Sequence, residues 1–227
     1  MPAPLIVFDL DGTLVDTAPD LVETLNTILT PEGVPPIAYH EARKVVGAGA
    51  RVMIQRAFAL HDMICDDTNL ERLFNSYLDH YAEHLADQSQ PFSGVEETLD
   101  ALAARGFRFA VCTNKLEGLA KLLLDRLNLT QRFTFICGQD TFGVPKPDPT
   151  PLLRTISASD ATRERTVMIG DSATDVRTAR AAKVGVVAVD FGYSDVPARD
   201  LGADRLISRF ADLPDAVMDV LERVKPA

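Results

Sequence analysis

The stretch VFDLDGTLVD at residues 7–16 constrains the fold more than any other part of the sequence. It continues an apolar run at residues 5–8 that is typical of a buried strand, and it places Asp9 and Asp11 at the end of that strand. Alternate side chains of a strand share a face, so the two carboxylates can point to the same side. Gly12 then gives the backbone room to turn. Because open α/β sheets bind ligands at the carboxyl ends of their strands, the stretch predicts a site there.

Two carboxylates this close together repel each other, and packing alone gives no reason to keep both. Bound Mg²⁺ would neutralise them, since this ion prefers oxygen ligands and is often held together with a phosphate. A carboxylate can also act as a nucleophile and form an aspartyl-phosphate. A turn with solvated acids is the alternative, because Asp-Gly is a common turn signal. A helix–loop–helix calcium site is not favoured, because it needs an acid or amide at Thr13 and a glycine at Leu14.

The composition of the 227 residues is that of a globular protein, and its charge argues against some classes of binding partner. The formal net charge of −10 argues against nucleic acid or a membrane surface, and no apolar run is long enough to span a bilayer. The three cysteines, Cys65, Cys112 and Cys137, have no CxxC spacing, which argues against a disulfide framework or a zinc site. The apolar run at residues 1–8 is too short for a signal peptide. We expect a cytoplasmic protein, monomeric or homodimeric.

The pattern along the chain changes twice. Residues 17–90 show only helical spacing, with Thr17 suited to cap the first helix and Pro19 to its first turn. Further helices of this part are predicted at 40–46, 51–60 and 70–85. Beyond residue 90, helical segments alternate with strands predicted at 107–112, 133–137, 166–169, 185–189 and 206–207. Alternating strands and helices indicate a parallel sheet. The sequence therefore predicts a doubly wound, Rossmann-like α/β core formed by residues 1–16 and 91–227, with residues 17–90 inserted as a helical domain.

Polar residues also follow the later strands. Thr113 and Asn114 come after one strand, Lys146 lies between two prolines in a loop, and Asp171 and Asp175 follow another strand. In a parallel sheet these strand ends lie along one edge. Each residue has a simpler interpretation: Thr113 can cap a helix, Lys146 can be a solvated loop lysine, and the two acids can stabilise a helix N-terminus. Together with the acids of the first strand they supply the nucleophile, cation and metal ligands of phosphoryl transfer.

This set of residues resembles the haloacid dehalogenase superfamily of phosphatases. The resemblance covers essentially the whole chain, and the helical insertion is similar to the small alpha-helical cap of that family. The four matching motifs, in order along the chain, are Asp9-Leu10-Asp11-Gly12-Thr13, Thr113, Lys146, and Gly170-Asp171 with Asp175. The family's dehalogenases use a carboxylate nucleophile without a metal, and Asp11 and Asp171 favour the phosphatase branch instead.

The resemblance implies a role for each matching residue. Asp9 is the nucleophile and Asp11 the general acid/base. Thr113, Asn114 and Lys146 bind the transferring phosphoryl group of a small phosphorylated metabolite.

The resemblance also implies the metal site. Mg²⁺ is held by Asp9, by the backbone carbonyl of Asp11 and by Asp171, and Asp175 supports these ligands.

Two stretches, residues 8–21 and 46–51, are similar to the phosphoglycolate phosphatase group. That group has a glycine-flanked cap segment facing the active site, which here contains Gly49 and Arg51. We expect Arg51 to bind a substrate carboxylate; the alternative is a surface arginine at a helix start. Residues 47–52 also begin a GxGxxG pattern, but Val52 replaces the last glycine, so dinucleotide binding is not favoured.

Other functions of the same core remain open. A sugar-phosphate mutase of the β-phosphoglucomutase type usually has a histidine early in the cap, near Leu21 here, and the chain has none between Asp11 and Ile37. A nucleotide or pyrophosphate hydrolase is a further alternative. A non-catalytic binding protein of this fold would have lost one of the core motif residues, and all of them are present.

Overall fold

The computed structural model, which describes residues 2–41, 45, 46 and 49–224, contains a six-stranded parallel sheet. The strand order is β5-β4-β1-β6-β7-β8. Their bounds are β1 (Leu5–Phe8), β4 (Arg108–Cys112), β5 (Phe133–Cys137), β6 (Thr166–Gly170), β7 (Gly185–Val189) and β8 (Arg205–Ile207). The predicted doubly wound α/β class is confirmed, and each predicted core strand is present to within one residue at either end.

Both faces of the sheet are apolar and covered by helices. In β1, Ile6 and Phe8 belong to one buried cluster, while Leu5 and Val7 belong to another on the opposite face. The covering helices are α5 (Val95–Ala104) and α9 (Leu213–Val224) on the first face, α7 (Thr150–Ala158) and α8 (Ala173–Ala182) on the second, and α6 (Glu117–Arg126) beside β5. A strand covered on both faces needs an apolar side chain at every position, which explains the run at residues 5–8.

The central strand β1 lies at the point where the chain reverses its direction across the sheet. Phe8 is in register with Val111 of β4 on one side and with Ile169 of β6 on the other. The chain builds β4 and β5 on the first side and then returns to build β6, β7 and β8 on the second. The segments that follow β1, β4 and β6 therefore meet at one edge, where this type of sheet binds ligands.

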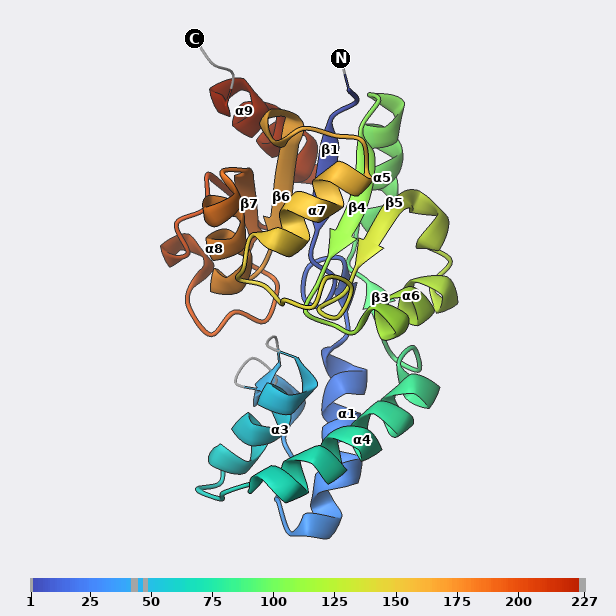
Figure 1. Cartoon of the computed structure of the whole chain (residues 1–227), viewed down its shortest axis with the longest axis vertical. Helices are drawn as coiled ribbons and strands as arrows, with labels where there is room; N and C mark the ends of the chain where they lie inside the picture. The colour runs from blue at the N-terminus through green and yellow to red at the C-terminus, as the bar shows by residue number, and fades with distance from the viewer. Residues whose placement is uncertain (1, 42–44, 47–48, 225–227) are drawn as a thin grey trace.

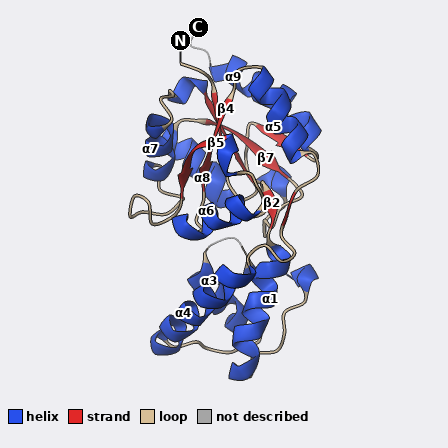
Figure 2. Cartoon of the chain, turned by 90° about the vertical axis from the view of Figure 1, so that its right-hand side faces the viewer, coloured by secondary structure: helices blue, strands red, loops and turns tan. Residues whose placement is uncertain are grey.

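Among the described residues, three α-helices form a separate unit beyond the carboxyl ends of the strands (Figures 1 and 2). They are α1 (Ala18–Leu29), α3 (Ala50–Ala59) and α4 (Asp67–His84). Pro19 lies in the first turn of α1, as predicted, but Thr17 makes no capping hydrogen bond with its side chain. The α4 helix begins earlier than predicted because the Asp66 carboxylate accepts a hydrogen bond from the Asn69 N–H at 2.9 Å.

The two chain segments that connect the helical unit to the sheet pair with each other. Strand β2 (Val15–Asp16) runs antiparallel to β3 (Gln90–Pro91), and the Phe92 N–H donates to the Leu14 carbonyl at 3.0 Å. The sequence predicted no strand within residues 17–90, and Gln90 corrects this, because a two-residue ribbon is too short to give a pattern. The division into core and cap at these positions stays a prediction.

Part of one predicted helix lies outside the described residues. Of the segment 40–46, residues 42–44 are not described, and a short 3₁₀ helix covers Tyr39–Glu41 before them. In the part of the chain that the structure describes, no helix has the length and apolar character needed to cross a membrane.

Candidate active site

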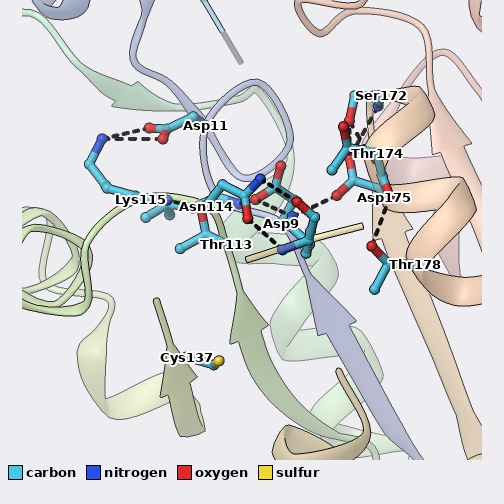
Figure 3. Close-up of polar contacts among 12 residues, drawn as sticks. Asp9, Asp11, Thr113, Asn114, Lys115, Cys137, Ser172, Thr174, Asp175 and Thr178 are labelled. Carbon is cyan, nitrogen blue, oxygen red and sulfur yellow. Dashed lines mark hydrogen bonds and ion pairs between the residues drawn. The ribbon is translucent and has the colours of Figure 1, made fainter. Parts of the chain in front are cut away.

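Predicted site residues of the core, among them Asp9, Thr113 and Asp175, come from different elements and meet at the edge of the sheet (Figure 3). Asp9 directly follows β1, and its N–H donates to the Ile169 carbonyl at 2.8 Å, which continues the sheet pairing by one residue. Thr113 follows β4, and its N–H donates to the Cys137 carbonyl at 2.9 Å. Asp175 lies in the first turn of α8 and is fully buried. Backbone hydrogen bonds of the sheet thus fix the positions of Asp9 and Thr113, and the first turn of α8 fixes the position of Asp175.

Lys146 is the cation at the centre of this cluster. Its Nζ lies 2.6 Å from Asp175 Oδ1 and 3.0 Å from Asp9 Oδ1, and its side chain is only 2% exposed. Burial alone would lower the pKa of Lys146, but the charges of Asp175 and Asp9 more than offset this and raise it above its ordinary value. Lys146 therefore keeps its positive charge in a buried site, next to the predicted nucleophile.

Two buried carboxyl groups of the cluster are costly to ionise. Burial raises the pKa of Asp9 from 3.8 to about 6; Lys146 opposes the shift, while Asp175 and Asp11 add to it. Burial also raises the pKa of Asp171 well above its ordinary value, and the charges of Asp175 and Asp9 act in the same direction. A cation bound between the carboxylates would remove this unfavourable energy.

The oxygens of the cluster fit such a cation. Asp9, Asp171 and Asp175 each offer an oxygen within 4.8 Å of the others. Both Asp175 oxygens already accept hydrogen bonds, Oδ1 from Lys146 and Oδ2 from the N–H (3.1 Å) and hydroxyl (2.7 Å) of Ser172. Asp171 Oδ2 accepts from the Tyr193 N–H at 2.6 Å. Within the described residues, no hydrogen bond reaches Asp9 Oδ2 or Asp171 Oδ1, so Asp171 Oδ1 is open to Mg²⁺ and Asp9 Oδ2 is open to a metal or a substrate.

Two polar residues follow the neighbouring strand β4: Asn114 holds the backbone of Lys146, and Thr113 contacts Lys115. The Asn114 side chain accepts from the Lys146 N–H at 2.8 Å and donates to the Lys146 carbonyl at 3.0 Å, so both ends of the amide hold the lysine backbone. The Thr113 hydroxyl accepts from the Lys115 N–H at 3.1 Å, which leaves its own hydrogen free to donate. Their predicted contact with a phosphoryl group stays a prediction.

The Asp11 carboxylate points toward Lys115 and away from Asp9 and Asp175 (Figure 3). It accepts from Lys115 Nζ at 2.9 Å through Oδ1 and at 3.2 Å through Oδ2. The same ammonium donates to the Tyr81 hydroxyl of α4 at 2.9 Å, so it connects the sheet edge to the helical unit. The sequence analysis did not identify Lys115, although it directly follows Thr113 and Asn114. The predicted metal contact through the Asp11 carbonyl stays a prediction.

A pocket lies between the sheet edge and the helical unit. Its walls include Asp9, Asp11 and Lys146 from the core, with Met53 and Tyr77 from the helices. In this arrangement about 50 Å³ is open to the centres of water-sized molecules. One water needs roughly 10–15 Å³ on that measure, so the pocket suits a small ligand.

The two cap residues predicted to bind substrate lie in different environments. Gly49, the N-cap residue of α3, lines the pocket. Arg51 is not among the pocket-lining residues: its guanidinium forms a two-point ion pair with Glu71, at 2.9 and 2.8 Å, and lies 3.5 Å from the centre of the Phe74 ring. Its side chain is 46% exposed. The structure therefore brings Gly49, but not Arg51, to the predicted site.

The chain is similar to known proteins over most of its length. The family model described as haloacid dehalogenase-like hydrolase matches residues 6–189. A phosphoglycolate phosphatase of Agrobacterium fabrum is 44% identical over 219 residues, which cover 96% of this chain and 94% of that protein.

A second relative and a solved structure extend the comparison. An N-acetylmuramic acid 6-phosphate phosphatase of Pseudomonas aeruginosa is 36% identical over 221 residues, which cover 96% of this chain and 94% of that protein. The crystal structure of a protein of Haemophilus somnus 129PT, described as a predicted phosphoglycolate phosphatase, superposes with a TM-score of 0.87 at 28% identity. That match covers 94% of this chain and 97% of the other.

Proposed function

The chain belongs to the haloacid dehalogenase-like hydrolase family and is a phosphatase, and we propose that it hydrolyses a small phosphomonoester through an aspartyl-phosphate on Asp9. The observation that carries this proposal is the set of contacts that the two oxygens of the Asp9 carboxylate make. Its Oδ1 is held by Lys146, while its Oδ2 accepts no hydrogen bond from the described residues and its side chain is 13% exposed at the pocket. Such an oxygen is oriented and available to attack a phosphorus atom.

The neighbouring groups supply the rest of the reaction. Lys146 and the Thr113 hydroxyl would bind the phosphoryl oxygens and so reduce the repulsion between the phosphate and Asp9; both residues line the pocket, and Lys146 contacts Asp9. Asp9 attacks phosphorus and the bond to the leaving oxygen breaks, while Asp11 donates a proton to that oxygen. Asp11 then takes a proton from the water that attacks the aspartyl-phosphate, which releases phosphate and restores both carboxyl groups.

We further propose that Mg²⁺ is held by Asp171 through its unpaired Oδ1 and by Asp9 through the oxygen that does not attack phosphorus, with the Asp11 carbonyl as the family resemblance implies. Asp175 supports the site by fixing Lys146. When bound, the ion would offset the negative charge of the phosphate and of the two carboxylates.

The substrate that best fits this site is 2-phosphoglycolate, hydrolysed to glycolate and phosphate. The relative at 44% identity bears that activity in its name, and the small pocket suits a two-carbon leaving group. The relative at 36% identity is named for a sugar phosphate, whose leaving group is larger than the two carbons of glycolate. A small phosphorylated metabolite is thus the proposed partner. We also propose a cytoplasmic location, which the three free cysteines support.

Phosphate release from purified protein tests the proposal. With Mg²⁺ present, we expect higher kcat/KM for phosphoglycolate than for N-acetylmuramic acid 6-phosphate, sugar phosphates and nucleotides. Removal of divalent ions with a chelator should abolish turnover, and added Mg²⁺ should restore it. Full activity after exhaustive chelation would refute the metal assignment, and a preference for one of the larger substrates would refute the choice of phosphoglycolate.

A further inference from the structure

The pocket contains two buried amines that serve different ends of the site. Lys146 lies between Asp9 and Asp175, whose charges offset its own. Lys115 is 5% exposed in its side chain and lies at the other end of the group drawn in Figure 3, against Asp11. Of the described residues that line the pocket, these two are the only lysines or arginines. Since Lys146 belongs to the phosphoryl end, Lys115 is the cation available to the leaving group.

The Tyr77 hydroxyl, which lines the same pocket, has no hydrogen-bond partner among the described residues. Tyr77 lines the pocket and is 2% exposed, and its hydroxyl makes no hydrogen bond within the described residues. Burial raises the pKa of Tyr77 well above its ordinary value, so the hydroxyl keeps its proton and can donate. A buried donor without an acceptor is unfavourable and rare in native proteins. A bound ligand with an acceptor oxygen would explain why this hydroxyl is there.

Tyr81 places a second donor next to the first. Tyr77 and Tyr81 lie one turn apart on α4, and their rings stack with centroids 5.6 Å apart and an interplanar angle of 18°. The Tyr81 oxygen accepts from Lys115 Nζ at 2.9 Å, and within the described residues its own hydrogen has no acceptor. Two phenol hydrogens and one ammonium thus meet at the same wall of the pocket.

This inference rests on the proposed function and extends it to the leaving group. We propose that the Tyr77 and Tyr81 hydroxyls, together with the Lys115 ammonium, bind the carboxylate of the leaving group and make the enzyme select short anionic phosphomonoesters. A carboxylate has two oxygens that can accept several hydrogen bonds, which matches the donors present. The ammonium also offsets the repulsion between this carboxylate and Asp11 once Asp11 has donated its proton.

The apolar residues around this group limit the length of the ligand. Leu21, Met53 and Leu119 line the same pocket and can contact a methylene group but not a polar chain. A one-carbon spacer between phosphate ester and carboxylate suits this wall. The subsite also replaces the role that the sequence suggested for Arg51, which is not among the pocket-lining residues.

A matched pair of substrates tests the subsite. Phosphoglycolate and its carboxamide analogue have nearly the same shape, but only the first carries a carboxylate. The quantity to measure is the ratio of their kcat/KM values, because a general loss of catalysis cancels in it. Tyr77→Phe removes a hydroxyl that makes no hydrogen bond within the described residues, so the variant should fold as the wild type does. We expect it to lower the ratio about tenfold, the effect of losing one hydrogen bond to a charged group.

Lys115→Met and Arg51→Gln complete the comparison. Lys115→Met should lower the ratio by at least about tenfold and also reduce turnover of both substrates, because Lys115 contacts Asp11. Arg51→Gln is the matched control: it removes a cation from the helical unit outside the pocket and should leave the ratio unchanged. A fall in the ratio with Arg51→Gln alone would assign the carboxylate to Arg51 and overturn the proposal.

The remaining outcomes separate the subsite from the proposed function. If wild type prefers phosphoglycolate but Tyr77→Phe and Lys115→Met leave the ratio unchanged, the subsite is wrong and the function stands. If wild type instead prefers another short phosphorylated hydroxy acid, and Lys115→Met removes that preference, the subsite stands and phosphoglycolate is wrong. A phosphatase with no preference for carboxylate-bearing substrates would overturn both.

Discussion

The backbone N–H of Tyr193 donates to Asp171 Oδ2 at 2.6 Å, so a loop after β7 fixes a proposed metal ligand that follows β6. The side chain of the same tyrosine reaches the connection to the helical unit. Its hydroxyl donates to the Asp16 carboxylate and accepts from the Ala18 N–H at 2.9 Å. Burial and the neighbouring Asp16 raise the pKa of Tyr193, which keeps the hydroxyl protonated. One residue therefore connects the metal end of the site to the start of α1.

The first prediction separates these two contacts. Tyr193→Phe removes the hydroxyl but keeps the backbone N–H on Asp171, so Mg²⁺ affinity should stay within about twofold of wild type while the free energy of unfolding falls by about 1.5–3 kcal/mol. Urea unfolding and a Mg²⁺ titration measure the two quantities. Tyr39→Phe is the control: its hydroxyl also donates to Asp16, at 3.1 Å, but the residue is 54% exposed and should contribute less. Equal losses in the two variants would contradict this account.

The second prediction concerns the nucleophile. Asp9→Asn should fold normally and lose turnover, because an amide is a poor nucleophile. Asp11→Asn should also lose steady-state turnover, yet still allow slow transfer of the phosphoryl group to Asp9. Phosphate release measures turnover, and mass spectrometry of enzyme quenched in acid detects a phosphorylated protein. Near-normal turnover by Asp9→Asn would rule out the assignment.

The third prediction follows from the pKa of Asp9, which burial raises from 3.8 to about 6 against the effect of Lys146. Between these values the folded, metal-free protein binds more protons at Asp9 than the unfolded chain does. This carboxyl therefore makes the stability fall as the pH rises from about 4 to about 6. Asp9→Asn abolishes the effect, so its stability relative to wild type should increase by on the order of 3 kcal/mol between about pH 4 and pH 8.

Urea unfolding in the presence of a chelator, at several pH values, measures this difference. Asp148→Asn is a control of opposite sign, because hydrogen bonds from the side chain and backbone of Thr150 hold the pKa of this exposed carboxyl below its ordinary value. Its contribution is present above the ordinary pKa and lost as the pH falls. A stability difference between Asp9→Asn and wild type that does not change with pH would contradict the raised pKa.

The core of this molecule could be predicted from the sequence because each strand and the polar residue after it are marked by neighbouring residues. The apolar run at residues 5–8 ends in Asp9, and the same strand-then-polar pattern marks Thr113 and Asp171. The carboxyl ends of parallel strands lie at one edge of the sheet, and this does not depend on the length or sequence of the loops. The helical and strand periods then place the helical unit between the first two of these strands.

The parts that the sequence missed depend on pairing between distant residues. Tyr193 and Asp16 are 177 positions apart, and nothing local marks their contact. The helix predicted at residues 70–85 contains Tyr77 and Tyr81, but its spacing does not show that both side chains line the pocket. Arg51 has the charge suited to a substrate carboxylate, but Glu71, which is 20 positions away and lies on α4, pairs with it.

The last prediction tests whether the close approach of Gly192 to Asp171 is needed to hold the metal ligand. A Cβ atom at Gly192 would lie 2.3 Å from Asp171 Cβ and 2.4 Å from its Oδ2, so Gly192→Ala must displace the carboxylate. We expect the affinity for Mg²⁺ to fall about 10- to 100-fold, as for other residues that orient metal ligands. Gly118→Ala, in α6, is the control, because its Cβ would meet nothing within 4 Å and alanine favours a helix. Calorimetric titration with Mg²⁺ measures both variants, and wild-type affinity in Gly192→Ala would show that Asp171 tolerates displacement or does not hold the metal.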